Sequence, residues 1–582
     1  MAIDAFVILI YFVVVISIGL YKGCGDKSMQ GFAIGDRNIP WWAVLASILA
    51  AEISAGTFLG TPGEGYGLRN FTYVQLAIGT ILARVVVSYV FIKPYYDYRV
   101  VSIYQYLLVR FGITTRNAAS AIFLITRALA SGTRLYVAAI ILLLGFQMVT
   151  GVKPSPGQEL AIYVGALTLL TVLTAVYTAL GGIKAVVWTD LIQASIMFGS
   201  MAFAIWFLLR EIPGGWAQAK SMLHGENDLR VFDSGTTPGV GFFQNVKNVL
   251  ETEYTLWAAF FGSVFTTMAT HGTDQDMVQR MLTAKDHRRS RLALISSGLA
   301  DIPIVSAFLV IGILLWVFYQ LHPDPNLPKN AHVFAYYILH QLPVGVRGLL
   351  VAGLFATAMG SLSTALNALA TSFTEDWYRP YLRPQASQRE ELAAARWSTV
   401  VFAVILIAIG SVTAWVVIQN PKARIIPIVL GVFGYTYGSL LGVFMVGMLT
   451  RSRGSNRGNV LAMVCGFVVV SILSGLHNEV WDLTHPAAAS VRVATVDLSK
   501  ELKRPATPAE VGEKLHLDPA KVTQLQNSPA GSQQLYSPDW LPTIEFPWRI
   551  MFGTLVTFGV ALCFRTPETQ LEVVRAHLAR TE

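Results

Sequence analysis

Long apolar runs recur along this chain almost from end to end, separated by short polar segments. About 20 mostly apolar helical residues are needed to cross the hydrocarbon core of a bilayer. Runs of that length predict an all-α membrane protein with about thirteen transmembrane helices. They lie near residues 3–21, 40–61, 70–93, 118–147, 159–180, 184–209, 254–280, 292–319, 346–374, 396–418, 425–449, 458–476 and 547–564.

Composition supports a single membrane domain over several soluble ones. Charged residues make up 13% of the chain, which is about half the share found in soluble domains. The net charge of +8 is interpreted through its placement on loops, so membrane lipid and no nucleic acid is the expected surface partner. The three cysteines lie far apart and form no disulfide framework, which fits a bacterial inner membrane.

Lysine and arginine predict how the chain is oriented, because cytoplasmic loops carry an excess of them. If the N-terminus is outside, the loops expected inside are rich in both residue types. The short loops expected outside hold only Arg69, Lys153, Lys422 and Arg424. This pattern predicts an outside N-terminus, an inside C-terminus and an odd number of spans.

Polar segments divide the chain. The predicted parts are a transporter domain at 1–476, an extracytoplasmic loop at 477–546, and a last span with a short cytoplasmic tail at 547–582. Within the loop, Thr507 to Glu510 form a capping box that opens a short helix, and Asp518 begins a second. We interpret the loop as a solvated connection, with a docking module as the alternative.

Residues 50–63 interrupt an apolar run with one carboxylate, three hydroxyls, three glycines and a proline. Backbone released from helical pairing at membrane depth is tolerated only against protein or a water-filled cavity. Such breaks bind ions and substrates in transporters. We therefore expect unwinding near 50–54. Packing through Gly56 and Gly60 is the alternative, against which the costly carboxylate of Glu52 counts.

Two further segments carry polar residues at membrane depth. Span 254–280 holds hydroxyls, a glycine and acidic residues between 266 and 276, five spans after the first break. Corresponding breaks in two five-helix halves are typical of an inverted repeat, here about 40–209 and 254–450. Span 346–374 carries hydroxyls at helical spacing, which either face an ion or bond back to their own helix.

Two isolated charges complete the pattern. Asp190 lies a turn or two inside its span, and Arg134 lies near the middle of span 118–147. A mid-membrane arginine needs an anionic partner. That partner is either a substrate carboxylate, which a guanidinium binds with two hydrogen bonds, or Glu52 in a structural ion pair. The sequence leaves both alternatives open.

Together these motifs resemble the sodium/solute symporter family, which includes sodium/glucose, sodium/proline and sodium/sialic-acid symporters. The resemblance implies a leucine-transporter-like fold, a 5+5 inverted repeat with extra flanking helices, and sodium as the coupling ion. It also implies which groups bind sodium. These are the positions of Ala50, Ile53, Thr357, Ser361 and Asp190. A second family hydroxyl falls on Gly360, which has no side chain and so departs from the pattern.

The resemblance implies a set of substrate-binding residues as well. To the break residue Glu52 and the charge Arg134 it adds Thr57, Thr61, Gln75, Thr267 and Thr270. Sugar-binding members carry larger groups at several of these positions, so a sugar is not favoured. If Arg134 binds the substrate, the substrate bears a carboxylate.

The sequence thus predicts a multi-pass inner-membrane transporter that couples sodium to uptake of a small organic solute by alternating access. Gly360 and Glu52 motivate one alternative, a proton-coupled or uncoupled transporter. A transporter-like solute sensor is another. The sequence shows no nucleophile with paired carboxylates, no metal cluster and no phosphate-binding loop, so an enzyme is not expected.

Overall fold

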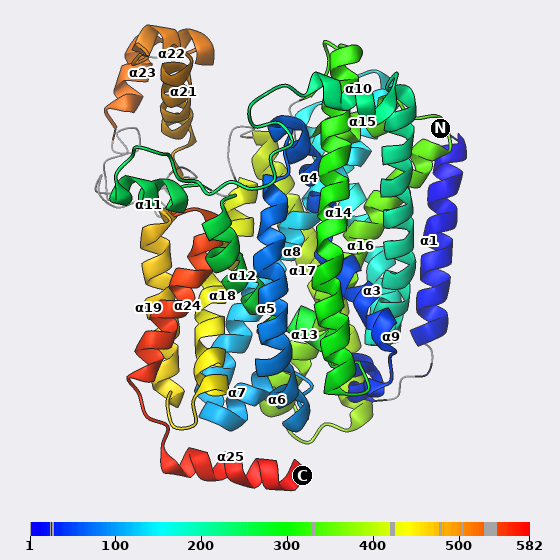
Figure 1. The fold of residues 1–582 in the computed structure, drawn as a ribbon. Coiled ribbons are helices and arrows are strands. Elements are labelled where there is room, and N and C mark those ends of the chain that lie inside the picture. Colours follow the sequence, from blue (N-terminus) through cyan, green and yellow to red (C-terminus); the bar gives the residue numbers. More distant parts are fainter. Residues whose placement is uncertain are drawn as a thin grey trace.

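Apolar helices packed side by side form the body of the molecule in the computed structural model (Figure 1). The structure describes residues 2–581 apart from 24, 26–27, 253, 329–331, 420–424, 477–479, 481, 483, 503 and 529–543. Within that range no β-strand occurs. The helices are α1 (Ala2–Gly23), α2 (Met29–Ile34), α3 (Trp41–Glu52), α4 (Ala55–Leu68), α5 (Leu76–Val90), α6 (Ile92–Asp97), α7 (Tyr104–Phe111), α8 (Ile113–Thr150), α9 (Pro156–Glu211), α10 (Gly215–Met222), α11 (Phe242–Leu250), α12 (Val264–Gly272), α13 (Gln275–Met281), α14 (His287–Leu321), α15 (Val333–His340), α16 (Val346–Phe373), α17 (Gln388–Gln419), α18 (Ile425–Leu449), α19 (Asn456–Leu473), α21 (Pro486–Leu502), α22 (Pro508–Leu515), α23 (Pro519–Gln526), α24 (Phe546–Leu562) and α25 (Glu568–Thr581).

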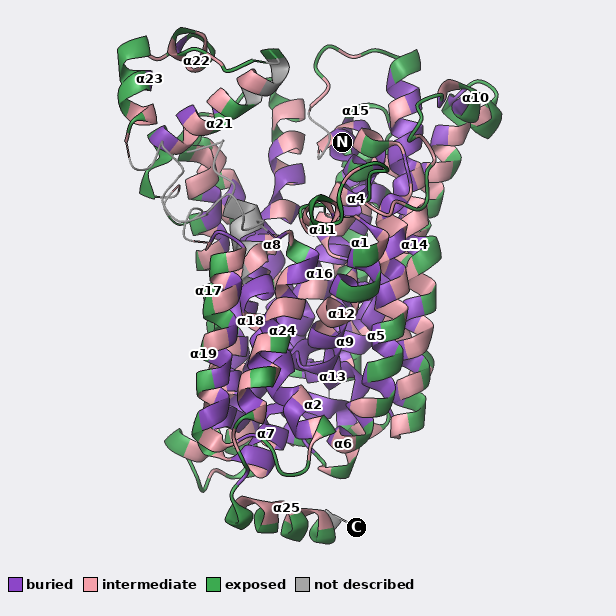
Figure 2. Cartoon of the chain, turned by 60° about the vertical axis from the view of Figure 1, so that its left-hand side comes forward, coloured by how far each residue is buried: buried purple, intermediate pink, exposed green. Residues whose placement is uncertain are grey.

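Each predicted apolar run falls on one of these helices or on a broken pair. In the described part of the chain, eight helices are long and apolar enough to cross a membrane, or nine if the bent pair α3–α4 counts as one span. Exposed residues lie on the outer faces of the bundle and buried ones within it (Figure 2). Exposed apolar side chains on that outer face match a lipid-facing surface. The number of crossings stays a prediction.

The first predicted break is confirmed. Helix α3 ends at Glu52, α4 begins at Ala55, and the two helices meet at an angle of 65°. Ile53 and Ser54 between them have extended backbone, and the Ser54 hydroxyl accepts a hydrogen bond from the Thr57 backbone N–H at 3.4 Å. The hydroxyl thus caps the second half-helix, while the backbone of two residues is released from helical pairing.

The second break is confirmed as well. A π-helical segment (Ala258–Ser263) continues into α12, which ends at Gly272, and α13 begins at Gln275. Asp274 caps α13 by accepting a hydrogen bond from the Asp276 backbone N–H at 2.9 Å. Each half of the predicted repeat therefore contains an interrupted helix.

The two predicted spans 159–180 and 184–209 form one helical element, α9, with a turn at Gly182. A straight helix of 56 residues would be about 84 Å long, nearly three times the hydrocarbon thickness. Gly182 has φ 52° and ψ −150°, a conformation almost restricted to glycine. Its turn separates the two spans, against the backbone of Phe32.

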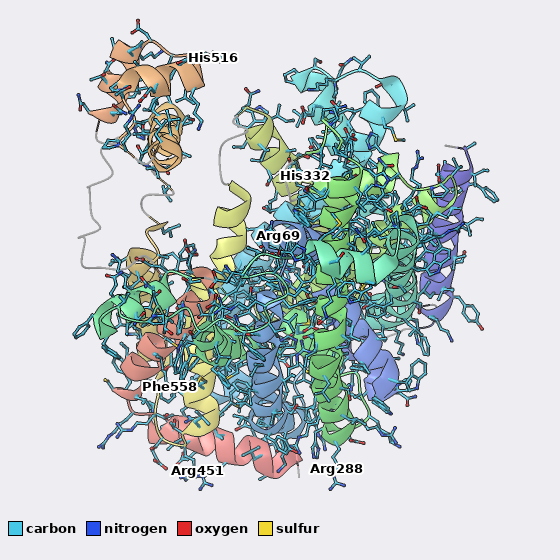
Figure 3. All side chains as sticks on the ribbon, turned by 45° about the horizontal axis from the view of Figure 1, so that its top comes forward. Arg69, Arg288, His332, Arg451, His516 and Phe558 are labelled. Atoms are coloured by element: carbon cyan, nitrogen blue, oxygen red, sulfur yellow. The ribbon has the colours of Figure 1, made fainter. Side chains whose placement is uncertain are left out.

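The chain ends lie at opposite ends of the bundle (Figure 1), as an odd number of crossings requires. The amphipathic helix α25 lies at the C-terminal end. Arg288 and Arg451, both expected inside, lie at that end too, far from His516 in the segment expected outside (Figure 3). The placement agrees with the predicted orientation, which stays a prediction.

Within the segment 477–546, the described residues 486–502 and 504–526 include three helices. Thr507 opens α22 with the predicted capping box, and Asp518 caps α23. Helix α21, which was not predicted, packs on both around a small core of Val491, Ala494, Val511 and Val522. Residues 486–526 thus form a three-helix unit with an apolar centre of its own.

Replacing Gly182 with alanine should destabilise the protein by about 2 kcal/mol or more, because the residue would combine a disfavoured backbone with a clash. A Cβ atom there would lie 2.5 Å from the Phe32 carbonyl oxygen. The melting temperature in detergent should fall. Gly165→Ala in the same helix, where a Cβ meets nothing within 4 Å, is the matched control. Equal melting temperatures for the two variants would contradict the assigned turn.

Candidate functional site

A cavity of about 420 Å³ lies between the two helix breaks. Glu52, Ile53 and Ser54 from the first break line one side, and Thr267, Thr270 and His271 from α12 line another. Helices α5, α8, α14 and α16 also contribute. Because the released backbone faces this space, the breaks satisfy the condition that irregular backbone at membrane depth borders protein or a cavity.

One wall of the cavity is a cluster of charged side chains drawn from four helices. Arg84 of α5 donates to Glu52 of α3 and, at 2.7 Å, to Asp301 of α14. His271 of α12 lies with Nε2 2.5 Å from Glu52 Oε1. Arg84 also donates to the Ser297 hydroxyl at 2.6 Å, which fixes the guanidinium between the two carboxylates.

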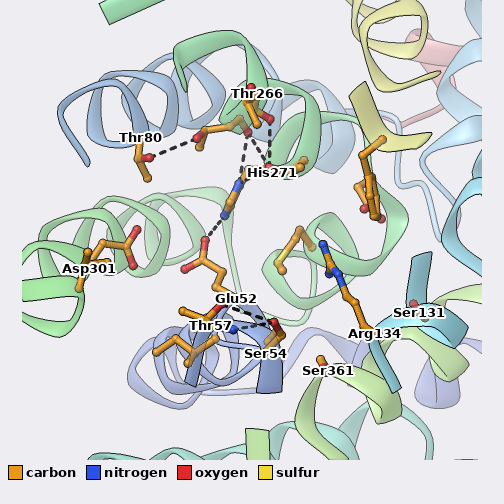
Figure 4. A pocket seen from close by; sticks show the side chains of 18 of the residues that line it. Glu52, Ser54, Thr57, Thr80, Ser131, Arg134, Thr266, His271, Asp301 and Ser361 are labelled. Carbon is orange, nitrogen blue, oxygen red and sulfur yellow. Dashed lines mark hydrogen bonds and ion pairs between the residues drawn. The ribbon is translucent and has the colours of Figure 1, made fainter. Parts of the chain in front are cut away.

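Arg134 lies across the cavity from that cluster, with Glu52 between it and Asp301 (Figure 4). Its guanidinium sits over the ring of Phe433, 5.1 Å from the ring centroid. Within the described residues, no hydrogen bond or ion pair joins Arg134 to the protein. Glu52 pairs with Arg84 and His271 instead, so the structural ion pair between Glu52 and Arg134 does not form.

The floor of the cavity is closed by a second charge network. Arg127 pairs with Asp274, at 3.2 Å, and with Asp276. Tyr437 of α18 donates to Asp274 at 2.7 Å. The second acid, Asp276, also binds Arg280 at 3.0 Å. Arg127 is therefore neutralised, and of the three arginines that line the cavity only Arg134 is without a carboxylate in the described structure.

Asp190 lies behind this floor, fully buried. Its Oδ2 accepts from the Ser47 hydroxyl at 2.6 Å and lies 3.5 Å from Arg280. Its Oδ1 has no partner within the described residues, and neither does the side-chain amide of Gln193, one turn along α9. A buried polar group without a hydrogen bond is costly unless something else occupies its lone pairs.

Both unpartnered groups point toward Gly360. A Cβ atom added there would lie 3.0 Å from Gln193 Oε1, 3.3 Å from the Ala50 carbonyl oxygen and 3.6 Å from Asp190 Oδ1. Three oxygens thus converge on the space that the missing side chain leaves. Hard cations prefer oxygen ligands, and a carboxylate supplies the charge. The donor set fits a bound sodium ion.

The structure brings only part of the predicted set to the cavity. The residues that line it are Glu52, Ile53, Thr57, Arg134, Thr267, Thr270 and Ser361. The remaining five, Ala50, Thr61, Gln75, Asp190 and Thr357, lie outside its lining.

Two of the outlying residues have other contacts. Gln75 donates to the Tyr254 carbonyl at 2.8 Å and accepts from the Asp233 backbone N–H at 3.2 Å, so it holds an outer loop. The Thr357 hydroxyl bonds back to Leu354 in its own helix, at 2.7 Å. Ser361 does the same, with both Thr357 and Ala358 at 3.1 Å. A hydroxyl that donates to its own helix can still accept through its oxygen.

Sequence reasoning missed Arg84, Asp301 and Gln193. Each has a signal that was available, since each is a polar residue inside a predicted span. An intramembrane ionisable residue is a functional candidate by default. His271 also lies in the cavity wall, where its ring nitrogens contact Glu52 and Thr270.

Comparison with known proteins assigns the family. The model of the sodium:solute symporter family matches residues 32–466. The chain belongs to this family. It is a sodium-coupled solute symporter and a multi-pass membrane transporter, as predicted, and its relatives are transporters and not enzymes.

Individual relatives are distant but cover most of the chain. The sodium/sialic acid symporter SiaT of Proteus mirabilis is 25% identical, over 80% of this chain and 87% of SiaT. The human sodium-coupled monocarboxylate transporter 1 is 27% identical, over 80% of this chain and 72% of that protein. The human sodium/iodide cotransporter is 26% identical, over 94% and 79% respectively.

A solved structure confirms the fold. It is the substrate-bound, outward-open state of a Na⁺-coupled sialic acid symporter, with a TM-score of 0.71 at 19% identity. The alignment covers 96% of this chain and 97% of that one. The leucine-transporter-like architecture expected of this family is therefore the architecture of this symporter.

Replacing Arg84 with methionine should destabilise the symporter by about 3 kcal/mol or more, because two carboxylates lose their shared partner. Adding Asp301→Leu should restore part of that loss, since contacting charges are not additive. Thermal melting of Arg84→Met, Asp301→Leu and the double variant in detergent measures the effect. Arg210→Met, at the end of α9 and away from the cavity, is the control. If the double variant is as unstable as the sum of the two single changes, the cluster is not coupled.

Proposed function

We propose that this symporter takes up a carboxylate-bearing solute together with sodium, across the inner membrane, by alternating access. The observation that carries the proposal is Arg134. A guanidinium that lines a cavity at membrane depth, with no carboxylate from the described protein, needs an anion to neutralise it. A carboxylate matches its planar fork with two parallel hydrogen bonds, which a monatomic anion cannot form.

The relatives support an organic anion without fixing it. SiaT is named for sialic acid, and the human relative for monocarboxylates. The sodium/iodide cotransporter is named for an inorganic anion, so the family resemblance alone does not require a carboxylate. In this chain, the hydroxyls of Thr57, Thr267 and Thr270 line the same cavity and add neutral hydrogen-bonding partners.

Sodium, in this proposal, is held where the side chain of Gly360 is missing. Asp190 and Gln193 replace the absent hydroxyl, and Ala50 supplies a carbonyl next to the broken helix. The positions of Ile53, Thr357 and Ser361 complete the set by resemblance. Because Ala50 and Ile53 belong to α3 and its break, an ion bound there fixes the geometry of the element that also lines the solute cavity.

Coupling then follows from linkage. An ion that stabilises the conformation with the higher affinity for solute raises that affinity, and the solute raises the affinity for the ion by the same factor. The membrane potential adds about 2.3 kcal/mol per charge per 100 mV to inward movement of sodium. Transport of one singly charged anion with one sodium ion moves no net charge. A second cation in the same cycle would make uptake electrogenic.

Asp190→Asn should weaken sodium binding at least tenfold, because the proposed site loses its carboxylate charge. The melting temperature of the purified protein, in sodium against potassium at matched ionic strength, reports it. Saturating sodium should stabilise the wild type by about RT ln(1 + [L]/Kd), or about 2.7 kcal/mol at one hundred times Kd. Gln193→Ala, Gly360→Ala and Ser361→Ala should each reduce this stabilisation.

Ser195→Ala, exposed on the same helix, is the matched control and should respond to sodium as the wild type does. Melting in potassium shows whether each variant is folded. Should Asp190→Asn keep the full sodium response, the proposed ion position is wrong.

Arg134→Gln should abolish binding of carboxylates, and Arg134→Lys should weaken it about tenfold or more, because lysine keeps the charge but not the fork. The probes are N-acetylneuraminate and short monocarboxylates, added to the protein in saturating sodium, with stabilisation as the readout. Arg210→Lys is the control. Carboxylate binding that survives Arg134→Gln would contradict the proposal, while sodium stabilisation should be unchanged in that variant.

A further inference from the structure

The cavity has two poles of opposite charge. Two carboxylates, Glu52 and Asp301, share the single guanidinium of Arg84 on one wall. Arg134 stands on the opposite side (Figure 4). Between them, Arg127 is neutralised by Asp274 and Asp276 and adds no net charge to either pole.

His271 is the fourth side chain of this wall. Its Nδ1 lies 3.0 Å from the Thr270 hydroxyl, which can donate to it, and its Nε2 lies 2.5 Å from Glu52 Oε1. Nδ1 also lies 3.2 Å from the Thr267 carbonyl oxygen, which can only accept, so these contacts suit a protonated ring as well as a neutral one. With a neutral ring, Glu52 and Asp301 carry one more negative charge than Arg84 supplies.

Two carboxylate oxygens on this wall are not used by Arg84. Glu52 Oε2 has no hydrogen-bond partner within the described residues, and Asp301 contacts Arg84 through Oδ2 alone. Both side chains keep some exposure, 15% and 17%, and both line the cavity. An ionised carboxylate oxygen is an acceptor only, so whatever meets it must donate a proton or carry positive charge.

We propose that the solute is zwitterionic, with its carboxylate on Arg134 and an ammonium or other cationic N–H group on Glu52 and Asp301. This inference rests on the proposed function, because it takes sodium-coupled carboxylate binding as given. A simple carboxylate would leave Glu52 and Asp301 without a cationic partner from the solute. A neutral sugar would leave these two carboxylates and Arg134 without a partner of opposite charge. The cavity of about 420 Å³ is at the small end of ligand sites, which suits an amino-acid-sized solute.

The test uses matched triplets of probes that differ in one charged group. One triplet is L-phenylalanine, 3-phenylpropionate and 2-phenylethylamine, and another is L-proline, cyclopentanecarboxylate and pyrrolidine. The remaining common amino acids and glycine betaine complete the panel. Stabilisation of the wild-type protein in saturating sodium gives an apparent Kd for each probe. At least one zwitterion should bind tenfold or more tightly than both of its analogues, as expected for a charge-assisted hydrogen bond.

Asp301→Asn should reduce the preference for the zwitterion over its carboxylate analogue to within about threefold, while the carboxylate analogue binds as before. Asp97→Asn, an exposed carboxylate far from the cavity, should leave the preference intact. If Asp301→Asn does not fold, the comparison of probes on the wild type still decides the question.

Two outcomes would overturn the inference and leave the proposed function standing. In one, carboxylate analogues bind as tightly as zwitterions, or no zwitterion binds although sodium and a plain carboxylate do. In the other, Asp301→Asn weakens the sodium response and not the probe preference, which would assign the acidic wall to a second sodium ion. If the proposed function itself is wrong, the result is different, because binding of the carboxylate probes would then not depend on Arg134.

Discussion

The pairing of Arg84 with two carboxylates at once is the interaction on which the site depends. A charge among apolar helices is tolerated only with a counter-charge, and here the counter-charges come from different helices. Glu52, Arg84, His271 and Asp301 belong to α3, α5, α12 and α14, so one cluster ties both broken helices to two continuous ones. Because Glu52 is taken by this cluster, Arg134 is left facing the cavity. Within the described residues, Arg134 has no carboxylate partner because Glu52 is paired with Arg84 and His271.

The region around Asp190 and the solute cavity are joined by direct contacts. Arg280 lies against Asp190 at 3.5 Å and against Asp276 at 3.0 Å, and Asp276 pairs with Arg127 in the cavity floor. Arg280 also donates to the Ser47 carbonyl of α3 at 2.5 Å. A change of charge at Asp190 therefore acts on groups that touch the cavity without any long-range rearrangement. These direct contacts between the Asp190 region and the cavity are a physical basis for linkage, and double-mutant cycles measure the coupling free energy.

The features that were predicted correctly depend on residues close together in the sequence. Glycine, proline and hydroxyl residues within an apolar run predicted the interruption near Ser54, and the pair Thr507 and Glu510 predicted the start of α22. Ion pairs between residues distant in sequence could not be predicted from the sequence. Glu52 and Arg84 are 32 residues apart, and Arg84 and Asp301 are 217 apart. No periodicity encodes which arginine takes which acid, so the choice between Glu52 and a solute as the partner of Arg134 required three-dimensional structure. Helix α21 was missed because, with 17 residues and four charged side chains, it is too short and too polar to be recognised as a membrane span.

Gly360 shows how a departure from a family pattern is absorbed by its surroundings. Loss of a hydroxyl removes one oxygen from the expected sodium ligands, which by itself predicts weaker binding. The same loss leaves space beside Asp190 and Gln193, both buried and both with unpartnered atoms in the described structure. A carboxylate oxygen is a stronger ligand for a hard cation than a hydroxyl, because it adds Coulomb attraction. In the proposed sodium site, the missing hydroxyl at Gly360 is therefore offset by the charge of Asp190.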